Sequence, residues 1–342
     1  MAEIVFGVGS SHSPMLGTDP DIWDQFAIKD TYHPPAHPFR GGFYPFEELR
    51  EFRKGENLAA ENSEEKRWER HHQNQKNLDR LGDEIAQAKL DVLVIIGDDQ
   101  RECFMPDNSP AFLIYNGEAV LNKVANPERL AQARHGIAEA AWMNVPEGGD
   151  IEHPGEPDLA NRIIAALMGA EFDIAVSQAM PAGKFGENGI PHAYGFFYHR
   201  LMDDMKKTPG MSTLPIFINT FYPPNQPSVR RVLRFGEVIG DAIRSWDSDK
   251  KVGIAASGGF SHFAIDEELD MRIIRAMEAG DEATILAEPE YSFQAGNSEI
   301  KNWLATQAAV AGSGLKFELI DYIPCYRSDA GTGNANTFGV WS

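Results

Sequence analysis

The chain has 342 residues and a formal net charge of −20 at pH 7. This length accommodates one large domain with a sizeable hydrophobic core, and because no linker divides residues 1–342 we predict a single domain. The acidic balance argues against nucleic-acid and anionic-membrane partners, since both bind a basic face.

Targeting and redox signals favour a cytoplasmic protein. The residues after Met1 lack the basic and apolar regions of a signal peptide, and no apolar run approaches the length of a membrane span. The two cysteines, Cys103 and Cys325, form no C-x-x-C pair and suit a reducing compartment.

Strands and helices are predicted to alternate along the chain. Runs of apolar and β-branched residues predict strands at 4–8, 91–97, 111–115, 173–177, 214–220, 252–256 and 316–323, the last leading into the Gly-rich residues 330–333. Helical spacing predicts helices at 61–90, 131–141, 157–167, 227–246 and 267–278, and one more around Glu299 and Trp303. This alternation predicts an α/β fold with a central mixed sheet flanked by helices.

Residues 17–58 are rich in proline, glycine and aromatic side chains. Proline at this density prevents long helices. A long loop in a compact domain is usually functional, so we expect a covering loop over a site. His33 and His37 lie in this segment with metal-pair spacing, but the prolines around them forbid the helical geometry that would align them.

Three histidines, His12, His192 and His262, follow predicted strands that are far apart in the sequence. The paired glycines Gly258 and Gly259 let the backbone near His262 approach a large group. Sites in α/β proteins are built at convergent strand ends, where imidazoles and carboxylates suit a mononuclear metal site or an acid–base site. No H-E-x-x-H, G-x-S-x-G or Walker motif is present.

Six motifs in chain order resemble the class III extradiol ring-cleavage dioxygenases, the family of the protocatechuate 4,5-dioxygenase catalytic subunit. They are Ser10–Pro14, Asp98–Asp99, the loop with His192, Asn219–Pro224, Gly258–His262, and Gly296–Glu299 with Trp303. The N-terminal loop, the Gly97–Gln100 motif and residues 326–333 are most similar to the 3-O-methylgallate and gallate branch. The resemblance spans nearly the whole chain.

The resemblance implies a non-haem Fe(II) enzyme that opens a catechol- or gallate-type ring with O₂, in aromatic-compound degradation. It assigns His12 and Glu299 as iron ligands, His262 as the acid–base histidine and His192 as a catalytic histidine of the substrate loop. Iron held on one face by two histidines and a carboxylate keeps positions open for the diol and for O₂. A small aromatic diol, O₂ and a second copy of the chain in a homodimer are the partners it implies.

Five further residues are candidates to bind the substrate. Arg327, like Arg101, has a guanidinium that suits a substrate carboxylate, although a structural salt bridge explains either arginine equally well. Tyr222 and Phe260 are candidates to contact the aromatic ring, with core packing as the simpler explanation, and Asp99 completes the set.

Gln100 stands where the family pattern has its second histidine ligand. Three interpretations remain open. Gln100 or a neighbouring aspartate binds the metal, a histidine from elsewhere such as His33, His37 or His71 replaces it, or the site holds another metal or is impaired. The alternatives for function are a ring-cleaving enzyme for an aminophenol or hydroxypyridine, and a non-catalytic paralogue.

Overall fold

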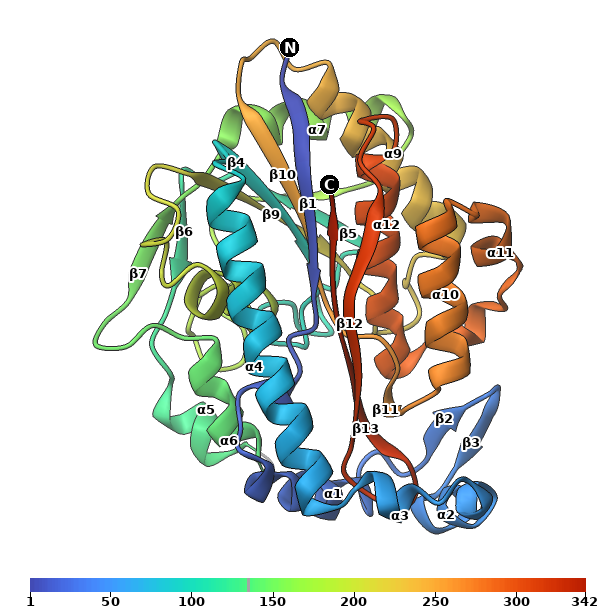
Figure 1. Ribbon diagram of the computed structural model, residues 1–342. Coiled ribbons are helices and arrows are strands. Elements are labelled where there is room, and N and C mark those ends of the chain that lie inside the picture. Colours follow the sequence, from blue (N-terminus) through green and yellow to red (C-terminus); the bar gives the residue numbers. More distant parts are fainter. Residues whose placement is uncertain (134–135) are drawn as a thin grey trace.

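The computed structural model describes residues 1–133 and 136–342, which fold around one large mixed sheet (Figure 1). Eight strands follow the order β11-β13-β1-β10-β4-β9-β5-β8, and β12 pairs with β13. The strands are β1 (Glu3–Ser10), β4 (Val92–Gly97), β5 (Phe112–Tyr115), β8 (Ala175–Ser177), β9 (Ser212–Ile218), β10 (Lys251–Ser257), β11 (His262–Ala264), β12 (Phe317–Tyr326) and β13 (Thr332–Trp341). This confirms the predicted α/β class.

Four neighbouring strands of the sheet, β1, β10, β4 and β9, run parallel to one another. Their carboxyl ends therefore meet at one edge of the sheet. The flanking strands run the other way, because β13 is antiparallel to β1 and β5 is antiparallel to β9. The loops after four parallel strands are thus brought together, as the sequence predicts for a site at convergent strand ends.

Helices cover both faces of the sheet. The main ones are α4 (Glu64–Gln87), α7 (Pro157–Gly169), α9 (Val229–Arg244), α10 (Glu267–Ala279) and α12 (Ile300–Val310). Shorter helices are α1 (Trp23–Asp30), α2 (Phe46–Arg53), α3 (Leu58–Glu61), α5 (Pro127–Ala131), α6 (Ile137–Ala140), α8 (His192–Phe196) and α11 (Glu282–Ala287). Two small antiparallel sheets lie outside the main sheet: the hairpin of β2 (His37–Phe39) with β3 (Gly42–Tyr44), and the pair of β6 (Ala119–Asn122) with β7 (Ile151–Pro154).

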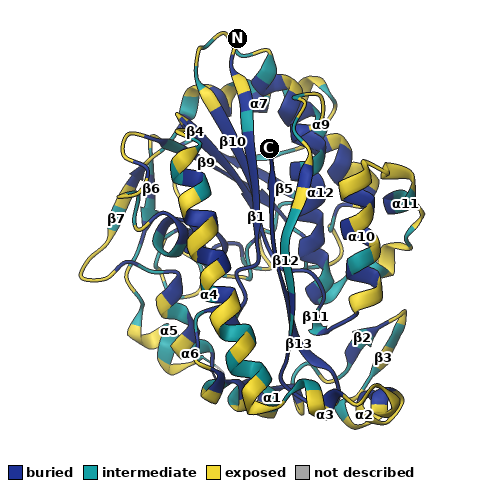
Figure 2. Ribbon diagram, viewed as in Figure 1, coloured by how far each residue is buried: buried dark blue, intermediate teal, exposed yellow. Residues whose placement is uncertain are grey.

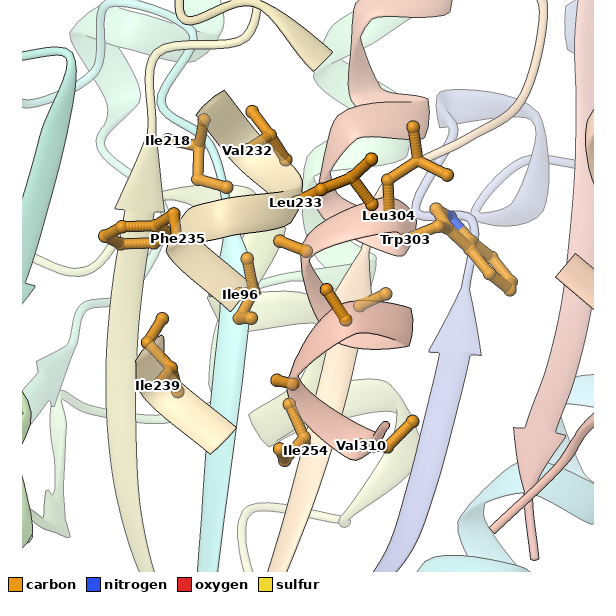
Figure 3. Packing of buried hydrophobic residues seen from close by; sticks show 14 of the residues in the cluster. Ile96, Ile218, Val232, Leu233, Phe235, Ile239, Ile254, Trp303, Leu304 and Val310 are labelled. Atoms are coloured by element: carbon orange, nitrogen blue, oxygen red, sulfur yellow. The ribbon is translucent and has the colours of Figure 1, made fainter. Parts of the chain in front are cut away.

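Strand β4 shows why its sequence is continuously apolar. Val92, Val94 and Ile96 belong to the core that contains α7, α9 and α12, a part of which Figure 3 shows. Leu93 and Ile95 face the other way, into the core that contains α4. Successive side chains of a strand point to opposite faces, so a strand covered on both faces needs apolar residues at every position. The outer face of α4 is exposed, in keeping with its charged sequence (Figure 2).

Helix α12 lies unusually close to the sheet and to α9. Gly9 of β1 lies under the Trp303 ring, where an added Cβ would be 2.2 Å from ring atoms. The Trp303 indole N–H donates to the Gly258 carbonyl oxygen at 2.8 Å. On its other side, α12 meets Gly236 and Gly240 of α9, where added Cβ atoms would be 2.1 and 2.2 Å from helix carbonyl oxygens. Glycine at these positions permits the close approach.

Several elements differ from the sequence-based expectation. The sequence predicts no strand after residue 323, and this prediction is wrong. Residues 332–341 form strand β13, whose ten residues are all buried. This strand pairs with β12 along one edge and with β1 and β11 along the other. Residues 17–58 form short helices and a hairpin, with no element longer than eight residues. The predicted helix at 131–141 includes 134–135, outside the described residues, with α5 and α6 on either side. No helix in the described ranges is long and apolar enough to span a membrane.

Replacing Gly9 by alanine tests the contact between β1 and α12. We expect Gly9→Ala to lower the free energy of unfolding by about 1–3 kcal/mol, because the added methyl group overpacks the space filled by Trp303. Urea denaturation measures the change. Gly169→Ala, at an exposed helix position with no atom within 4 Å of the added Cβ, is the control and should leave stability unchanged or slightly raised. Equal midpoints for the two variants would contradict the contact.

Candidate metal centre and active site

The candidate site lies where the parallel strands end. His12 follows β1, Asp98 follows β4, and His262 begins β11 a few residues after β10. Glu299 immediately precedes α12. A cavity of about 800 Å³ opens here, and its lining includes His12, His192, His262 and Glu299. The histidines that the sequence places after distant strands are therefore brought to one cavity.

Among residues 1–133 and 136–342, one group of histidine, cysteine, aspartate or glutamate side chains has metal-binding geometry. It consists of His12, Asp98 and Glu299, which offer one ligand atom each, all within 4.8 Å of one another. All three side chains are buried. His12 Nε2 and Glu299 Oε2 are 3.7 Å apart. One imidazole and two carboxylates are donors that fit a divalent first-row metal ion.

The hydrogen bonds around His12 fix its tautomer. The Ser257 hydroxyl donates to the Ala193 carbonyl oxygen at 2.6 Å, so its oxygen is left to accept a hydrogen bond from His12 Nδ1 at 2.9 Å. The proton therefore sits on Nδ1, and the Nε2 lone pair faces Glu299. Burial lowers the pKa of His12 to about 4, which keeps the imidazole neutral. A neutral imidazole oriented by a hydrogen bond on its other nitrogen is the form that binds metals.

Glu299 lies between His12 and His262. Its Oε2 accepts the Gly259 backbone N–H at 2.7 Å, and its Oε1 is 3.5 Å from His262 Nε2. The His262 Nδ1–H donates to the Phe260 carbonyl oxygen at 2.8 Å, which leaves Nε2 as the nitrogen on the side of the site. Burial acts to lower the pKa of His262, but the Glu299 carboxylate outweighs it and raises that pKa.

Gln100 contacts Asp98 and Tyr222. Its side-chain Nε2 donates to Asp98 Oδ2 at 2.7 Å, and its Oε1 is 3.4 Å from the Tyr222 hydroxyl. Asn302 donates to the other Asp98 oxygen at 3.3 Å and to the Ser257 carbonyl oxygen at 2.8 Å. Burial, and after it the charge of Glu299, raise the pKa of Asp98 to about 8.

His192 is held by a buried carboxylate, Glu102. The His192 Nδ1 and Glu102 Oε2 are 2.5 Å apart, and Glu102 also pairs with Arg129. Burial acts to lower the pKa of His192, but Glu102 outweighs it and raises that pKa to about 9. The ring lies edge-on to His12, with centroids 4.8 Å apart. The site therefore contains one neutral and one cationic imidazole side by side.

The remaining candidates for substrate binding, Asp99, Phe260 and Tyr222, differ in whether they reach the cavity. Asp99 accepts the backbone N–H groups of Glu102, Cys103 and Phe104 and so shapes the loop after β4. Phe260 is fully buried against Trp303, and Tyr222 lines the cavity.

Arg327 also lines the cavity, but its guanidinium is engaged within the protein. It forms a two-point ion pair with buried Asp30 at 2.7 and 2.9 Å and donates to Asn334 at 2.9 Å. The Arg327 guanidinium, considered above as a partner for a substrate carboxylate, is therefore already paired with Asp30. The structure shows the alternative considered there, a structural salt bridge.

The three histidines considered as replacement ligands are not in the metal-binding group. His33 lines the cavity, as Lys29 and Pro34 of the same segment do. His37 is buried against the Asp30 carbonyl oxygen, and His71 lies on α4 near Asp19. Sequence reasoning left Asp98 among the alternatives and missed Glu102 and Asn302. Asp98 directly follows the buried strand β4 and Glu102 lies in the polar loop after it, which is the signal that sequence offers for these two; Asn302, within α12, has no such signal.

Comparison with known proteins identifies a family and two similar proteins whose names describe ring-opening dioxygenases. A family model described as the catalytic LigB subunit of aromatic ring-opening dioxygenase matches residues 58–337. A 2,3-dihydroxyphenylpropionate/2,3-dihydroxicinnamic acid 1,2-dioxygenase of Mycobacterium sp. (strain MCS) is 28% identical over 189 residues, 54% of this chain and 50% of the relative. The protein of the same name from Mycobacterium ulcerans (strain Agy99) is 28% identical over 160 residues, 42% of this chain and 45% of the relative. The chain spans about half the length of the curated relatives it matches.

The Arg327–Asp30 pair provides a test of its structural role. We expect Asp30→Asn to lower the free energy of unfolding by about 3–5 kcal/mol, because it leaves the buried Arg327 charge without its partner. Asp24→Asn is the control, since the Asp24 side chain is 71% exposed and its pair with Arg67 contributes about 1 kcal/mol or less. Denaturant unfolding measures both. Equal losses of stability would contradict a structural role for the buried pair.

Proposed function

Because the chain belongs to the family of catalytic LigB subunits of aromatic ring-opening dioxygenases, we propose that it is an extradiol dioxygenase that opens a catechol-like ring with O₂. The observation that carries the proposal is the meeting of His12, Glu299 and His262 at one cavity. A metal ligand pair and an acid–base group are the two kinds of side chain that this reaction requires. Both atoms of O₂ enter the product.

We propose that the metal is Fe(II), held by His12 Nε2 and Glu299. The donors fit, because His12 presents a neutral nitrogen and Glu299 an oxygen only 3.7 Å away. When bound, the iron would let electron density pass from the diol to O₂, which no side chain can do. The Ser257 hydroxyl and the Gly259 N–H hold the two ligands in orientation.

His262 is the proposed acid–base residue. Its Nδ1–H is fixed on the Phe260 carbonyl oxygen, so Nε2 is available on the cavity side. This nitrogen can take the proton of a substrate hydroxyl and return it as the ring opens. Glu299 Oε1, 3.5 Å from Nε2, places this histidine beside the proposed metal site.

His192 is proposed to bind an oxygen of the substrate or of O₂. The Glu102 carboxylate accepts a hydrogen bond from His192 Nδ1 and stabilises the cationic form of the ring. The His192 Nε2–H is therefore left to donate a hydrogen bond in the cavity. A fixed cationic donor stabilises negative charge that develops on oxygen, and it does so best in a buried site. Glu102 and Arg129 thereby act through His192 as positioning residues.

The substrate is proposed to carry a carboxylate side chain. The two mycobacterial relatives are named for substrates that do. Arg101 lines the cavity with its guanidinium 4.2 Å from the centre of the Tyr222 ring, and the salt bridges of the described residues include none to it. We therefore assign recognition of the substrate carboxylate to Arg101 and not to Arg327, because the Arg327 guanidinium is already paired with Asp30.

Two alternatives are separated by direct assays. Ring opening of an aminophenol or a hydroxypyridine would give products with different absorption spectra in a substrate panel. A non-catalytic paralogue would bind metal without consuming oxygen. The gallate-type substrate, the homodimer and the cytoplasmic location stay predictions.

The role of His262 is tested by substitution. We expect His262→Ala to keep its metal and to lose about 10²–10⁴-fold in turnover, because proton transfer is removed and the ligands remain. Oxygen uptake with Fe(II) and 2,3-dihydroxyphenylpropionate measures turnover, and elemental analysis measures the metal. His72→Ala, at an exposed position on α4, is the control. Normal turnover in His262→Ala, or a wild-type protein that binds no divalent metal, would refute the mechanism.

The role of Arg101 is tested with charged and uncharged substrates. Arg101→Gln is expected to raise KM about 10–100-fold for a catechol with a carboxylate side chain, because a charge-assisted hydrogen bond is lost. KM for 3-propylcatechol should not change. Lys123→Gln is the control, because Lys123 also lines the cavity but already pairs with Asp150 at 3.5 Å. Equal KM increases for both substrates would exclude recognition of the carboxylate by Arg101.

A further inference from the structure

We propose that Asp98 is the third protein ligand of the metal and that Gln100 is the positioning residue that holds it. The centre would then consist of one imidazole and two carboxylates, from His12, Asp98 and Glu299. This inference rests on the proposed function in one respect, namely that the site holds a divalent metal ion. Among the alternatives that the sequence leaves open for the ligand at the Gln100 position, it selects the neighbouring aspartate.

The first argument is the arrangement of donor atoms. The ligand atoms of His12, Asp98 and Glu299 all lie within 4.8 Å of one another, on residues from three separate parts of the chain. His12 is 4% exposed, and the hydrogen bonds of the described residues include none to its Nε2. Because His12 lines the cavity and its Nδ1 is held by Ser257, the Nε2 lone pair is available to a metal ion in the cavity.

The second argument is the charge on Asp98. Asp98 is 2% exposed, and the ion pairs of the described ranges include no lysine or arginine partner for it. Its contacts are the neutral amides of Gln100 and Asn302, one on each oxygen. Two buried carboxylates in one cluster repel each other unless one of them is protonated or a cation lies between them. A divalent ion bound to both would balance their two charges.

The third argument is the orientation of Gln100. A carboxylate bound to a metal ion is ionised and only accepts hydrogen bonds, so in the loaded centre the Gln100 NH₂ group is the end that faces Asp98, the arrangement found here at 2.7 Å. The Gln100 carbonyl oxygen, the only atom through which this side chain could bind a metal, is turned toward the Tyr222 hydroxyl. Gln100 therefore orients a ligand, as hydrogen-bonding partners of metal ligands commonly do.

The ligand set has a consequence for the choice of metal. Two carboxylates and one imidazole form a harder donor set than two imidazoles and one carboxylate. Oxygen donors suit Mn²⁺ as well as Fe²⁺, so the protein should bind Mn²⁺. Mn²⁺ is therefore a suitable probe for the ligands, independent of turnover.

The experiment measures Mn²⁺ binding to the metal-free full-length protein by calorimetry. We expect one Mn²⁺ per chain in the wild type, and a loss of affinity of more than about 100-fold in the isosteric variant Asp98→Asn. Gln100→Leu should weaken binding by about 10–100-fold, the usual effect of removing the partner of a metal ligand. Asp91→Asn removes the same charge at the opposite end of β4 and should bind like the wild type.

The outcomes are distinguishable. Wild-type affinity in Asp98→Asn would overturn the proposal. A larger loss in Gln100→Leu than in Asp98→Asn would also overturn it and would make Gln100 the ligand. Thermal unfolding of the metal-free variants shows whether each is folded, and Asp98→Glu, which keeps the charge, should retain more affinity than Asp98→Asn. If Asp98 proves to be a ligand but the loaded wild type consumes no O₂ with catechols, the proposed function fails and the ligand set stands. If the wild type binds no metal, both fail.

Discussion

The close packing of α12 against the ends of β1 and β10 sets the geometry on which the site depends. Gly9 allows the Trp303 ring to lie directly on β1, and the Trp303 indole is tied to the Gly258 carbonyl oxygen. Glu299 lies one residue before α12, while His12 follows β1 by two residues. The contact of the Trp303 ring with Gly9 therefore sets how closely the start of α12 approaches the end of β1, where the Glu299 carboxylate and the His12 imidazole are 3.7 Å apart. A larger residue at position 9 would separate the two donors as well as strain the core.

Two neighbouring histidines show how a single partner decides the charge of a buried imidazole. His12 is bonded to a hydroxyl, that of Ser257, and burial keeps it neutral. His192, with its ring centre only 4.8 Å away, is bonded to the carboxylate of Glu102 and is cationic at neutral pH. The protein thereby places an electron-pair donor and a hydrogen-bond donor at the same cavity, using one residue type twice.

The sequence predicts the parts of this structure that depend on local pattern. Apolar runs followed by polar residues locate β1, β4 and β10 and the groups at their ends, because strand burial leaves a clear signature in the chain. Strand β13 leaves none, since its glycine and asparagine residues are those of a turn and it is specified only by neighbours on both edges. The partners of Arg327 and Gln100 are likewise invisible in sequence. Asp30 lies 297 residues from Arg327, and only the folded chain shows which side chain each amide or guanidinium faces.

The position of β13 also determines when the site can form during synthesis. Residues 338–341 pair with β1, and residues 332–334 pair with β11, which begins at His262. Strand β1, which leads into His12, therefore has an unpaired edge until more than 320 further residues have been made. Pairing over so long a separation is entropically expensive and slow. The candidate metal site would be assembled among the last contacts to form, so a nascent chain would have no finished centre in which a metal ion could bind prematurely.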